Sequence, residues 1–105
     1  MLIDHIRKEL NTNNRITETF YDNIFNHKDT KVIHNKLTDI TSVCVIVTPY
    51  NLELVGYSQH TTNVSDLTKQ KLAYENAKSK LKEVIDLLIV TNKIKGLWWI
   101  TYFIQ

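Results

Sequence analysis

The chain has 105 residues, a formal net charge of +2 and a hydrophobic content of 43%. This length supports a modest core and leaves no room for a second one, so we expect a single domain over residues 1–105. The small net charge does not by itself indicate nucleic-acid binding. The single cysteine, Cys44, lies in an apolar run and indicates a buried thiol rather than a disulfide.

Residues 1–27 are predicted to form two short helices. Apolar residues at helical spacing share one side of the first helix, which ends at the polar run 11–14. Thr17 is the expected N-cap of the second helix, because its hydroxyl can accept a hydrogen bond from a free backbone N–H. The polar run 26–30 then ends this helix.

Residues 31–59 are predicted to form antiparallel strands. The first strand begins at Lys31, and its flanking lysines suit the edge of a sheet. The apolar, β-branched run 42–48 indicates a strand that is central in its sheet or buried on both faces. In the turn that follows, Asn51 tolerates the left-handed conformation. Gly56 in the last strand indicates a bulge or a close approach of another group to the backbone.

A long helix is predicted over residues 65–95, which contain neither Gly nor Pro. Ser65 or Asp66 can cap its start. The predicted inner face follows a seven-residue repeat of Leu67, Tyr74, Leu81 and Leu88, widened by Ala73, Ala77, Val84 and Ile85. Most lysines, Lys69 among them, fall on the other face. We therefore expect an α+β fold: a small antiparallel sheet of three or four strands, packed by a long C-terminal helix, with two short N-terminal helices.

Residues 97–105 form an apolar tail with two tryptophans. A helix that spans a bilayer needs about 20 apolar residues, so the tail is too short to cross a membrane. It is also too apolar to remain in contact with water. Three interpretations remain open: a last strand or helical turn docked on the core, a contact between subunits, or a peripheral membrane contact.

No catalytic or metal-binding motif has convincing spacing in this chain. The four histidines lie far apart, and Cys44 has no neighbouring histidine. With only two glycines, the chain also lacks the glycine-rich patterns that bind phosphates. We therefore expect no catalytic residue, no metal and no cofactor, and a protein that is not an enzyme.

The richest polar cluster is the loop 57–63, which joins the last strand to the long helix. Backbone N–H groups at the start of a helix, with hydroxyl and amide groups nearby, can hold a phosphate or carboxylate. The candidate contacts are Ser58, Thr61, Thr62, Asn63 and Lys69, with Tyr50 or Tyr57 stacking on a base. Two plainer alternatives remain open: an ordinary solvated connector, and tyrosines that belong to the core.

Several short motifs along the chain form a set. They are Thr41-Ser-Val-Cys-Val-Ile-Val47, Asn51, Val55-Gly-Tyr-Ser58, Asn63 and Lys71-Leu-Ala-Tyr-Glu-Asn-Ala77. This set resembles the phage gene 49/gene 66 family of small tailed-phage proteins, whose most specific motif is a K-[IL]-A-x-E-N-A helix. The similarity covers residues 1–88. Leu52 stands where that family usually has Gly, and Val64 where it has an aromatic residue.

The resemblance implies a function as well as a fold. The family is similar in organisation to phage proteins that counter Thoeris immunity by trapping its cyclic ADP-ribose signal and that form dimers or larger rings. It therefore implies a phage-encoded anti-defence protein, a homo-oligomer in the host cytoplasm without membrane contact, that sequesters a cyclic nucleotide without cleaving it. The implied ligand contacts are Arg15, Tyr50, Asn51, Tyr57, Ser58, Thr61, Thr62, Asn63 and Lys69.

Two other functions remain open. An inhibitor could bind a host defence protein such as a nuclease, through the lysine-bearing face of the long helix or through the apolar tail. A phage accessory protein that binds nucleic acid would need a basic stripe. Residues 66–95 carry seven lysines against four acidic residues, which is a modest surplus for that purpose.

Overall fold

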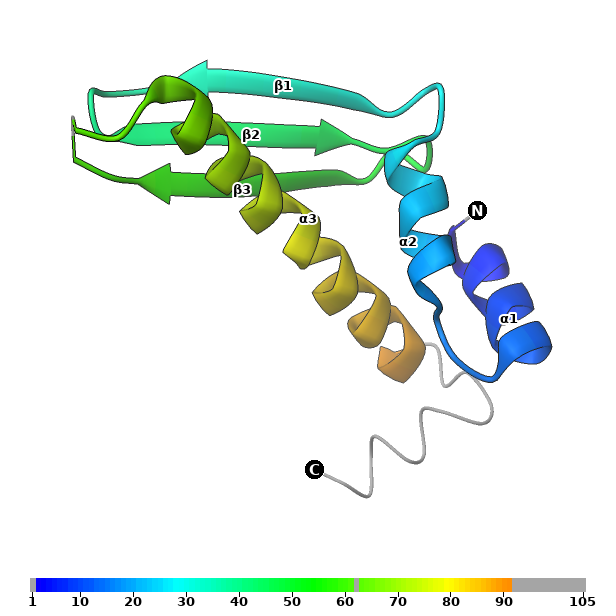
Figure 1. Ribbon diagram of the computed structural model, residues 1–105. Coiled ribbons are helices and arrows are strands. Elements are labelled where there is room, and N and C mark those ends of the chain that lie inside the picture. Colours follow the sequence, from blue (N-terminus) through cyan, green and yellow to red (C-terminus); the bar gives the residue numbers. More distant parts are fainter. Residues whose placement is uncertain (1, 62, 92–105) are drawn as a thin grey trace.

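Within the residues that the structure describes, 2–61 and 63–91, the protein has three helices and a three-stranded antiparallel sheet (Figure 1). The structure is a computed structural model. In chain order its elements are α1 (Leu2–Asn13), α2 (Glu18–Phe25), β1 (Lys31–Lys36), β2 (Thr41–Val47), β3 (Glu53–Gln59) and α3 (Asp66–Thr91). The predicted α+β class is confirmed. The predicted end of the long helix near residue 95 and the tail 97–105 lie outside the described residues.

The two N-terminal helices begin and end close to the predicted positions. After α1, Asn14 adopts a left-handed conformation with φ of 60° and donates its N–H to Leu10 O at 2.9 Å. The Thr17 hydroxyl accepts a hydrogen bond from Phe20 N at 3.3 Å, so Thr17 is the N-cap of α2 as predicted.

Glu9 connects these two helices. Its carboxylate accepts a hydrogen bond from Thr17 N at 3.2 Å and another from the Thr17 hydroxyl. The bond from the hydroxyl is the main cause that lowers the pKa of Glu9, because it favours the ionised carboxylate. Desolvation of the carboxylate opposes this effect only in part. Ionised Glu9 therefore stabilises the corner between α1 and α2.

The strands follow one another in the order β1–β2–β3, which leaves β1 at an edge as its lysines predict. In the central strand β2, Val45 pairs with Ile33 on one side and with Val55 on the other. Asn51, in the turn between β2 and β3, has the expected left-handed φ of 59°. Alternate residues of β2 are buried and half-buried, so this strand is central but is not buried on both faces.

The long helix α3 crosses one face of the sheet (Figure 1). On that face the sheet presents Ile46 and Leu54, which are fully or almost fully buried. The backbone of α3 lies against Gly56: a methyl group there would overlap Ala73 O and Ala77 N and would lie 2.7 Å from Ala77 Cα. The close approach predicted at Gly56 is therefore made by the protein's own helix.

The buried residues of α3 recur every four positions. They are Lys69, Ala73, Ala77, Leu81, Ile85 and Ile89. Ala73, Ala77, Leu81 and Ile85 are buried as predicted. Leu67, which the repeat placed on the inner face, is 78% exposed, whereas Lys69, which the repeat placed outside, is only 2% exposed. The prediction was wrong in the first turn, because the helical position of Ala73 and Ala77 on the sheet turns position 69 inward and position 67 outward.

The N-terminal helices complete the core. Ile6 of α1 and Ile24 of α2 belong to one buried cluster with Ile85 and Ile89 of α3. Figure 1 accordingly shows α1 and α2 at one end of the sheet, next to the second half of α3. The first half of α3 lies over the sheet, so the two halves of this helix bury different partners.

The other face of the sheet carries no described element, and we call it the open face (Figure 1). Its apolar residues are Ile33, Val43, Val45, Val47, Val55 and Tyr57. Ile33 is 53% exposed, Val55 37% and Tyr57 57%. The sheet therefore presents an apolar surface to solvent within the part of the chain that the structure describes.

Gly56→Ala is expected to lower the free energy of unfolding by about 3 kcal/mol, because the added methyl group forces α3 away from β3. Urea denaturation measures this loss. Gln59→Ala, at an exposed position of the same strand, is the control, and we expect it to change stability by less than about 0.5 kcal/mol. A Gly56→Ala variant as stable as the control would contradict the close packing of α3 on the sheet.

Glu9→Gln is expected to reduce stability at neutral pH and to have a smaller effect in acid. Because the folded-state pKa of Glu9 is lowered, ionised Glu9 stabilises the fold above the unfolded-state pKa of about 4.3. This stabilisation is lost as the pH falls through the lower folded-state pKa. Urea denaturation at about pH 7 and about pH 2.5 compares the two proteins. An equal difference at both pH values would be evidence against the Glu9–Thr17 contact.

Candidate functional site

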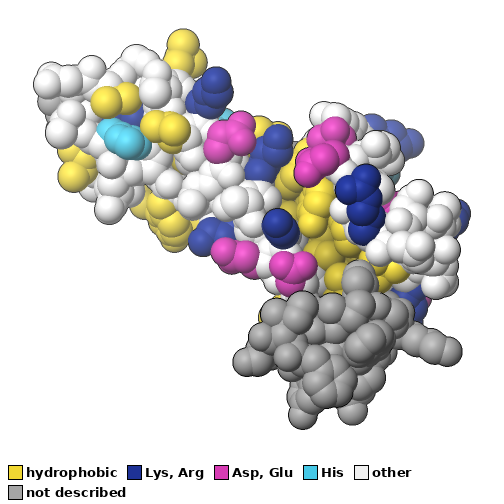
Figure 2. Space-filling model, turned by 60° about the horizontal axis from the view of Figure 1, so that its bottom comes forward, with side chains coloured by type: hydrophobic (Ala, Val, Ile, Leu, Met, Phe, Trp, Pro, Cys, Tyr) yellow, Lys and Arg dark blue, Asp and Glu magenta, His cyan; other side chains and the backbone are white. Residues whose placement is uncertain are grey.

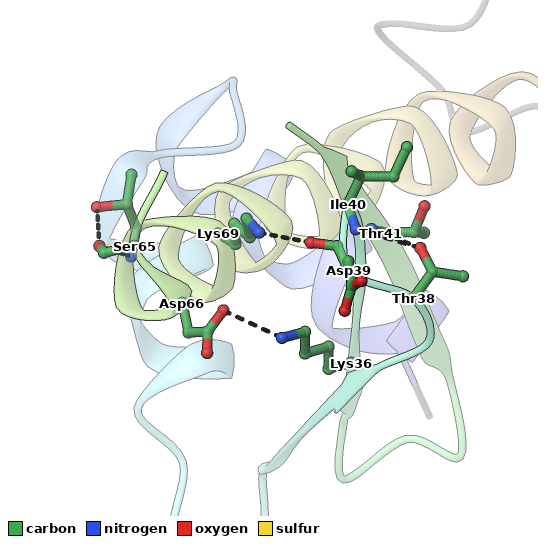
Figure 3. Close-up of polar contacts among 9 residues, drawn as sticks. Lys36, Thr38, Asp39, Ile40, Thr41, Ser65, Asp66 and Lys69 are labelled. Carbon is green, nitrogen blue, oxygen red and sulfur yellow. Dashed lines mark hydrogen bonds and ion pairs between the residues drawn. The ribbon is translucent and has the colours of Figure 1, made fainter. Parts of the chain in front are cut away.

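A pocket of about 320 Å³ lies where the amino end of α3 meets the turn between β1 and β2. We call it the Lys69 pocket, and its lining residues are Lys36, Asp39, Val64, Ser65, Asp66 and Lys69. A smaller hollow of about 80 Å³ shares Lys36 and Asp66 with it and also involves His34, Asn35, Ser42 and Gln70. Figure 3 shows the charged and hydroxyl side chains gathered between the helix and the turn.

Ser65 forms the N-cap of α3. Its hydroxyl accepts a hydrogen bond from Thr68 N at 3.2 Å and donates to Thr68 Oγ1 at 2.8 Å. Its carbonyl accepts a bond from Lys69 N at 3.0 Å. Asp66 follows in the first turn, where the positive end of the helix dipole favours a carboxylate. The first turn of α3 is thus fixed by local hydrogen bonds at one wall of the pocket.

Lys69 is the only charged side chain that is buried among the described residues. Its Nζ donates a hydrogen bond to Asp39 O at 2.7 Å. Thr38 holds the turn that presents this carbonyl, because its hydroxyl accepts bonds from Ile40 N at 3.3 Å and from Thr41 N at 3.0 Å (Figure 3). An ammonium has three N–H donors, so the bond to the Asp39 carbonyl leaves two for a further acceptor.

The pocket combines positive and negative side chains. Lys36 Nζ lies 3.7 Å from Asp66 Oδ1, and both side chains are at least half exposed, so this ion pair contributes at most about 1 kcal/mol to stability. Lys36 and Lys69 can attract a phosphate, while carboxylates such as Asp39 and Asp66 can accept hydrogen bonds from sugar hydroxyls. The charge pattern therefore suits a ligand with both phosphate and hydroxyl groups.

Ser58 lies on the covered face of β3, and its buried hydroxyl has no hydrogen-bond partner in the described part of the chain. It pairs across the strands with Ser42, which is also buried and lines the smaller hollow. A buried hydroxyl without a partner costs about 1–3 kcal/mol. The sheet therefore places two small polar groups beneath the first half of α3 at a cost in stability.

The structure gathers part of the predicted site at one end of the sheet. Lys69 belongs to the first turn of α3, Asn63 and Thr61 are exposed in the loop before it, and Ser58 lies in the adjoining strand. Thr62 lies outside the described residues.

The other four predicted residues lie elsewhere in the chain. Tyr57 is on the open face, on the opposite side of the sheet from α3. Tyr50 and Asn51 are in the turn at the far end of the sheet, where the Tyr50 ring is 5.3 Å from the His5 ring. Arg15 lies between α1 and α2. Seven-residue strands separate the two ends of the sheet by about 20 Å, so one small ligand does not reach both ends in a single chain.

Of the six residues that line the pocket, only Lys69 was predicted as a ligand contact, and Ser65 and Asp66 were predicted only as caps of the helix. Lys36 was interpreted only as a sign of an edge strand, and Asp39 provides a backbone carbonyl, which no side-chain pattern reveals. A usable signal was the antiparallel pairing itself, since it places the β1–β2 turn at the same end of the sheet as the connection from β3 to α3.

A second pocket, of about 270 Å³, lies between α2 and α3. Figure 2 shows hydrophobic side chains in the groove between the helices, with acidic and basic side chains on its rims. Lys78 Nζ lies 5.2 Å from the centre of the Phe25 ring and 5.4 Å from that of Tyr74. Burial, followed by the carboxylates of Asp86 and Glu18, raises the pKa of Tyr21 in this pocket. None of the predicted ligand contacts lines it.

The described residues contain no group of three or more His, Cys, Asp or Glu side chains that could hold a metal ion. Cys44 is buried, and burial raises the pKa of its thiol, which keeps the sulfur protonated. Across residues 2–61 and 63–91, no helix combines the length and the apolar composition that crossing a membrane requires.

Comparison of the chain with family models, curated proteins and solved structures finds no match. The resemblance to the phage family therefore stays a prediction that rests on short motifs. In the structure, the most specific motif, residues 71–77, supports the fold. Ala73 and Ala77 face Gly56, and Asn76 Oδ1 accepts a hydrogen bond from Tyr57 N at 3.0 Å on the outer edge of β3.

Lys69→Met is expected to leave the free energy of unfolding unchanged or to raise it by up to about 2 kcal/mol, because it removes a buried charge that has a neutral partner. Urea denaturation measures this change. Lys71→Met, at an exposed position of the same helix, is the control and should change stability by less than about 0.5 kcal/mol. If Lys69→Met instead costs more than about 2 kcal/mol, the main role of Lys69 is to hold the β1–β2 turn against α3.

Proposed function

We propose that the protein is a phage-encoded anti-defence protein that binds a cyclic nucleotide signal, of the cyclic ADP-ribose type, in the Lys69 pocket and holds it without cleaving it. The observation that carries this proposal is the buried ammonium of Lys69, whose partner is a neutral carbonyl. Burying an ammonium is costly unless its charge is compensated. A phosphate oxygen at the two remaining N–H donors would compensate it.

The other lining residues support the same class of ligand. The volume of about 320 Å³ is at the small end of the range for small-molecule sites. Lys36 supplies a second positive charge, and Asp39 and Asp66 can accept hydrogen bonds from ribose hydroxyls. Thr61 and Asn63 add exposed polar side chains in the loop beside the pocket. These groups bind and orient a ligand, and the proposed role in the host cytoplasm needs nothing more than binding.

A homo-oligomer would complete the site. The Lys69 pocket has no aromatic side chain among its lining residues, and Val64 is its apolar wall. Tyr50 and Arg15 are too far from the pocket within one chain, but the same residues of a neighbouring subunit could cover it. We therefore propose that an oligomer encloses the base of the nucleotide, which would slow its release.

Differential scanning fluorimetry with cyclic ADP-ribose isomers, cyclic dinucleotides and cyclic trinucleotides tests this function. A ligand that binds should raise Tm, because at about 100 times its Kd it stabilises the folded state by about 2.7 kcal/mol. Lys69→Met should abolish the shift, since it removes the charge that contacts phosphate, and Lys71→Met should retain it. Mass spectrometry of the ligand released by denaturation should recover the intact nucleotide.

Two results would contradict the proposal: a Tm that none of these ligands changes, or a released ligand that has been cleaved. A shift that persists in Lys69→Met would place the binding site elsewhere in the molecule. A protein that ignores the ligands but retains a host nuclease in a pull-down would support the alternative function, inhibition of a defence protein.

A further inference from the structure

The open face has a regular arrangement of side chains, because directly paired residues of an antiparallel sheet point to the same side. The pairing defines three rows across the strands. They are Lys31–Val47–Glu53 at one end, Ile33–Val45–Val55 in the middle, and Asn35–Val43–Tyr57 at the other end. An apolar centre is thus flanked by a row that has a positive charge on one strand and a negative charge on the other.

Lys31 and Glu53 are both exposed, and they stand on the two outer strands with Val47 between them. Neighbouring strands are about 4.8 Å apart, so the two charged residues are separated by about 10 Å across the sheet. Neither has an ion-pair partner within 4.0 Å among the described residues. Lys31 and Glu53 can therefore form ion pairs with another molecule that presents the same two charges in the opposite order.

We propose that two copies of the chain pack their open faces together around a two-fold axis parallel to β2. This rotation places β1 of each copy over β3 of the other and leaves each row opposite its own equivalent. Lys31 then faces Glu53 of the partner subunit, and Glu53 faces Lys31 of the partner subunit. Ile33 meets Val55 of the partner subunit, Val45 meets its own equivalent, and the Tyr57 hydroxyl reaches the side-chain amide of Asn35 of the partner subunit.

The charges select this symmetry over the other face-to-face arrangement. An axis that runs across the strands would place each β1 over its own equivalent in reverse. Lys31 would then face Asn35 of the partner subunit, and Glu53 would face Tyr57 of the partner subunit, so no ion pair would form. A pairing of the exposed β1 edges is disfavoured by the lysines at both ends of that strand, Lys31 and Lys36.

The size of the open face sets the expected affinity of the dimer. Three strands at about 4.8 Å spacing and about five residues at 3.3 Å each give a surface of roughly 15 by 17 Å. The area of this surface is well below the roughly 800 Å² that each partner buries in a standard interface. We therefore expect a reversible dimer that forms in the micromolar range or above, on the side of the sheet opposite the Lys69 pocket.

Sedimentation equilibrium of the full chain, at concentrations up to about 1 mM, tests the proposal. We expect the natural protein to show a monomer–dimer equilibrium. Glu53→Lys and Lys31→Glu should each raise the dimer Kd about tenfold, because each replaces two attractive pairs by two repulsive ones. The double variant, with Lys31→Glu and Glu53→Lys together, should return the Kd to within about threefold of the natural value, since it restores both pairs.

Glu83→Lys is the matched control, because it reverses an exposed charge on α3, away from the open face, and should leave the Kd unchanged. Far-UV circular dichroism checks that every variant is folded. A protein that stays monomeric at the highest concentration would overturn the proposal. So would a dimer whose Kd in both single variants equals that of the natural protein, or one that the double variant weakens further. None of these three outcomes depends on ligand binding, so this test is independent of the proposed nucleotide site.

Discussion

The contact between Gly56 and the backbone of Ala73 and Ala77 is the constraint on which the rest of the structure depends. It lets α3 lie directly on β3, closer than any side chain at position 56 would allow. This close approach brings Asn76 near enough to the outer edge of β3 to accept the Tyr57 N–H. It also decides which residues of α3 point at the sheet, because small residues at positions 73 and 77 define the inner face.

The buried position of Lys69 follows from this packing. One turn before Ala73, the same face of the helix reaches the end of the sheet, where the β1–β2 turn presents the Asp39 carbonyl. The helix N-terminus, two lysines and two carboxylates then meet around one pocket. The single α3 helix covers only one side of the sheet, so the open face is left with its apolar row. The placement of α3 on the sheet therefore accounts for both surfaces that we propose to be functional, the Lys69 pocket and the open face.

Sequence reasoning was most successful where the deciding interactions are local. The Thr17 cap, the left-handed Asn51 and the start of α3 at Ser65 depend on neighbours within a few residues. It was wrong for Leu67 and Lys69, because it favoured an apolar residue over a lysine in the first turn, where the packing of Ala73 and Ala77 on the sheet sets the orientation of the helix. For the candidate site, it selected Lys69 and the loop before α3 but missed Asp39, whose contribution is a carbonyl about 30 residues away.

The sequence alone determined the class of the protein: an α+β domain with an edge strand, a central apolar strand and one long amphipathic helix. These features follow from periodicity, caps and turn residues, which act over short distances along the chain. Only the tertiary structure decided that Lys69 rather than Leu67 is buried in the first turn of α3, which side of the sheet stays open, and that Lys36, Asp39 and Lys69 share a pocket. Those outcomes depend on contacts between residues far apart in sequence, and the register and closeness of such contacts are set by the packing of whole elements.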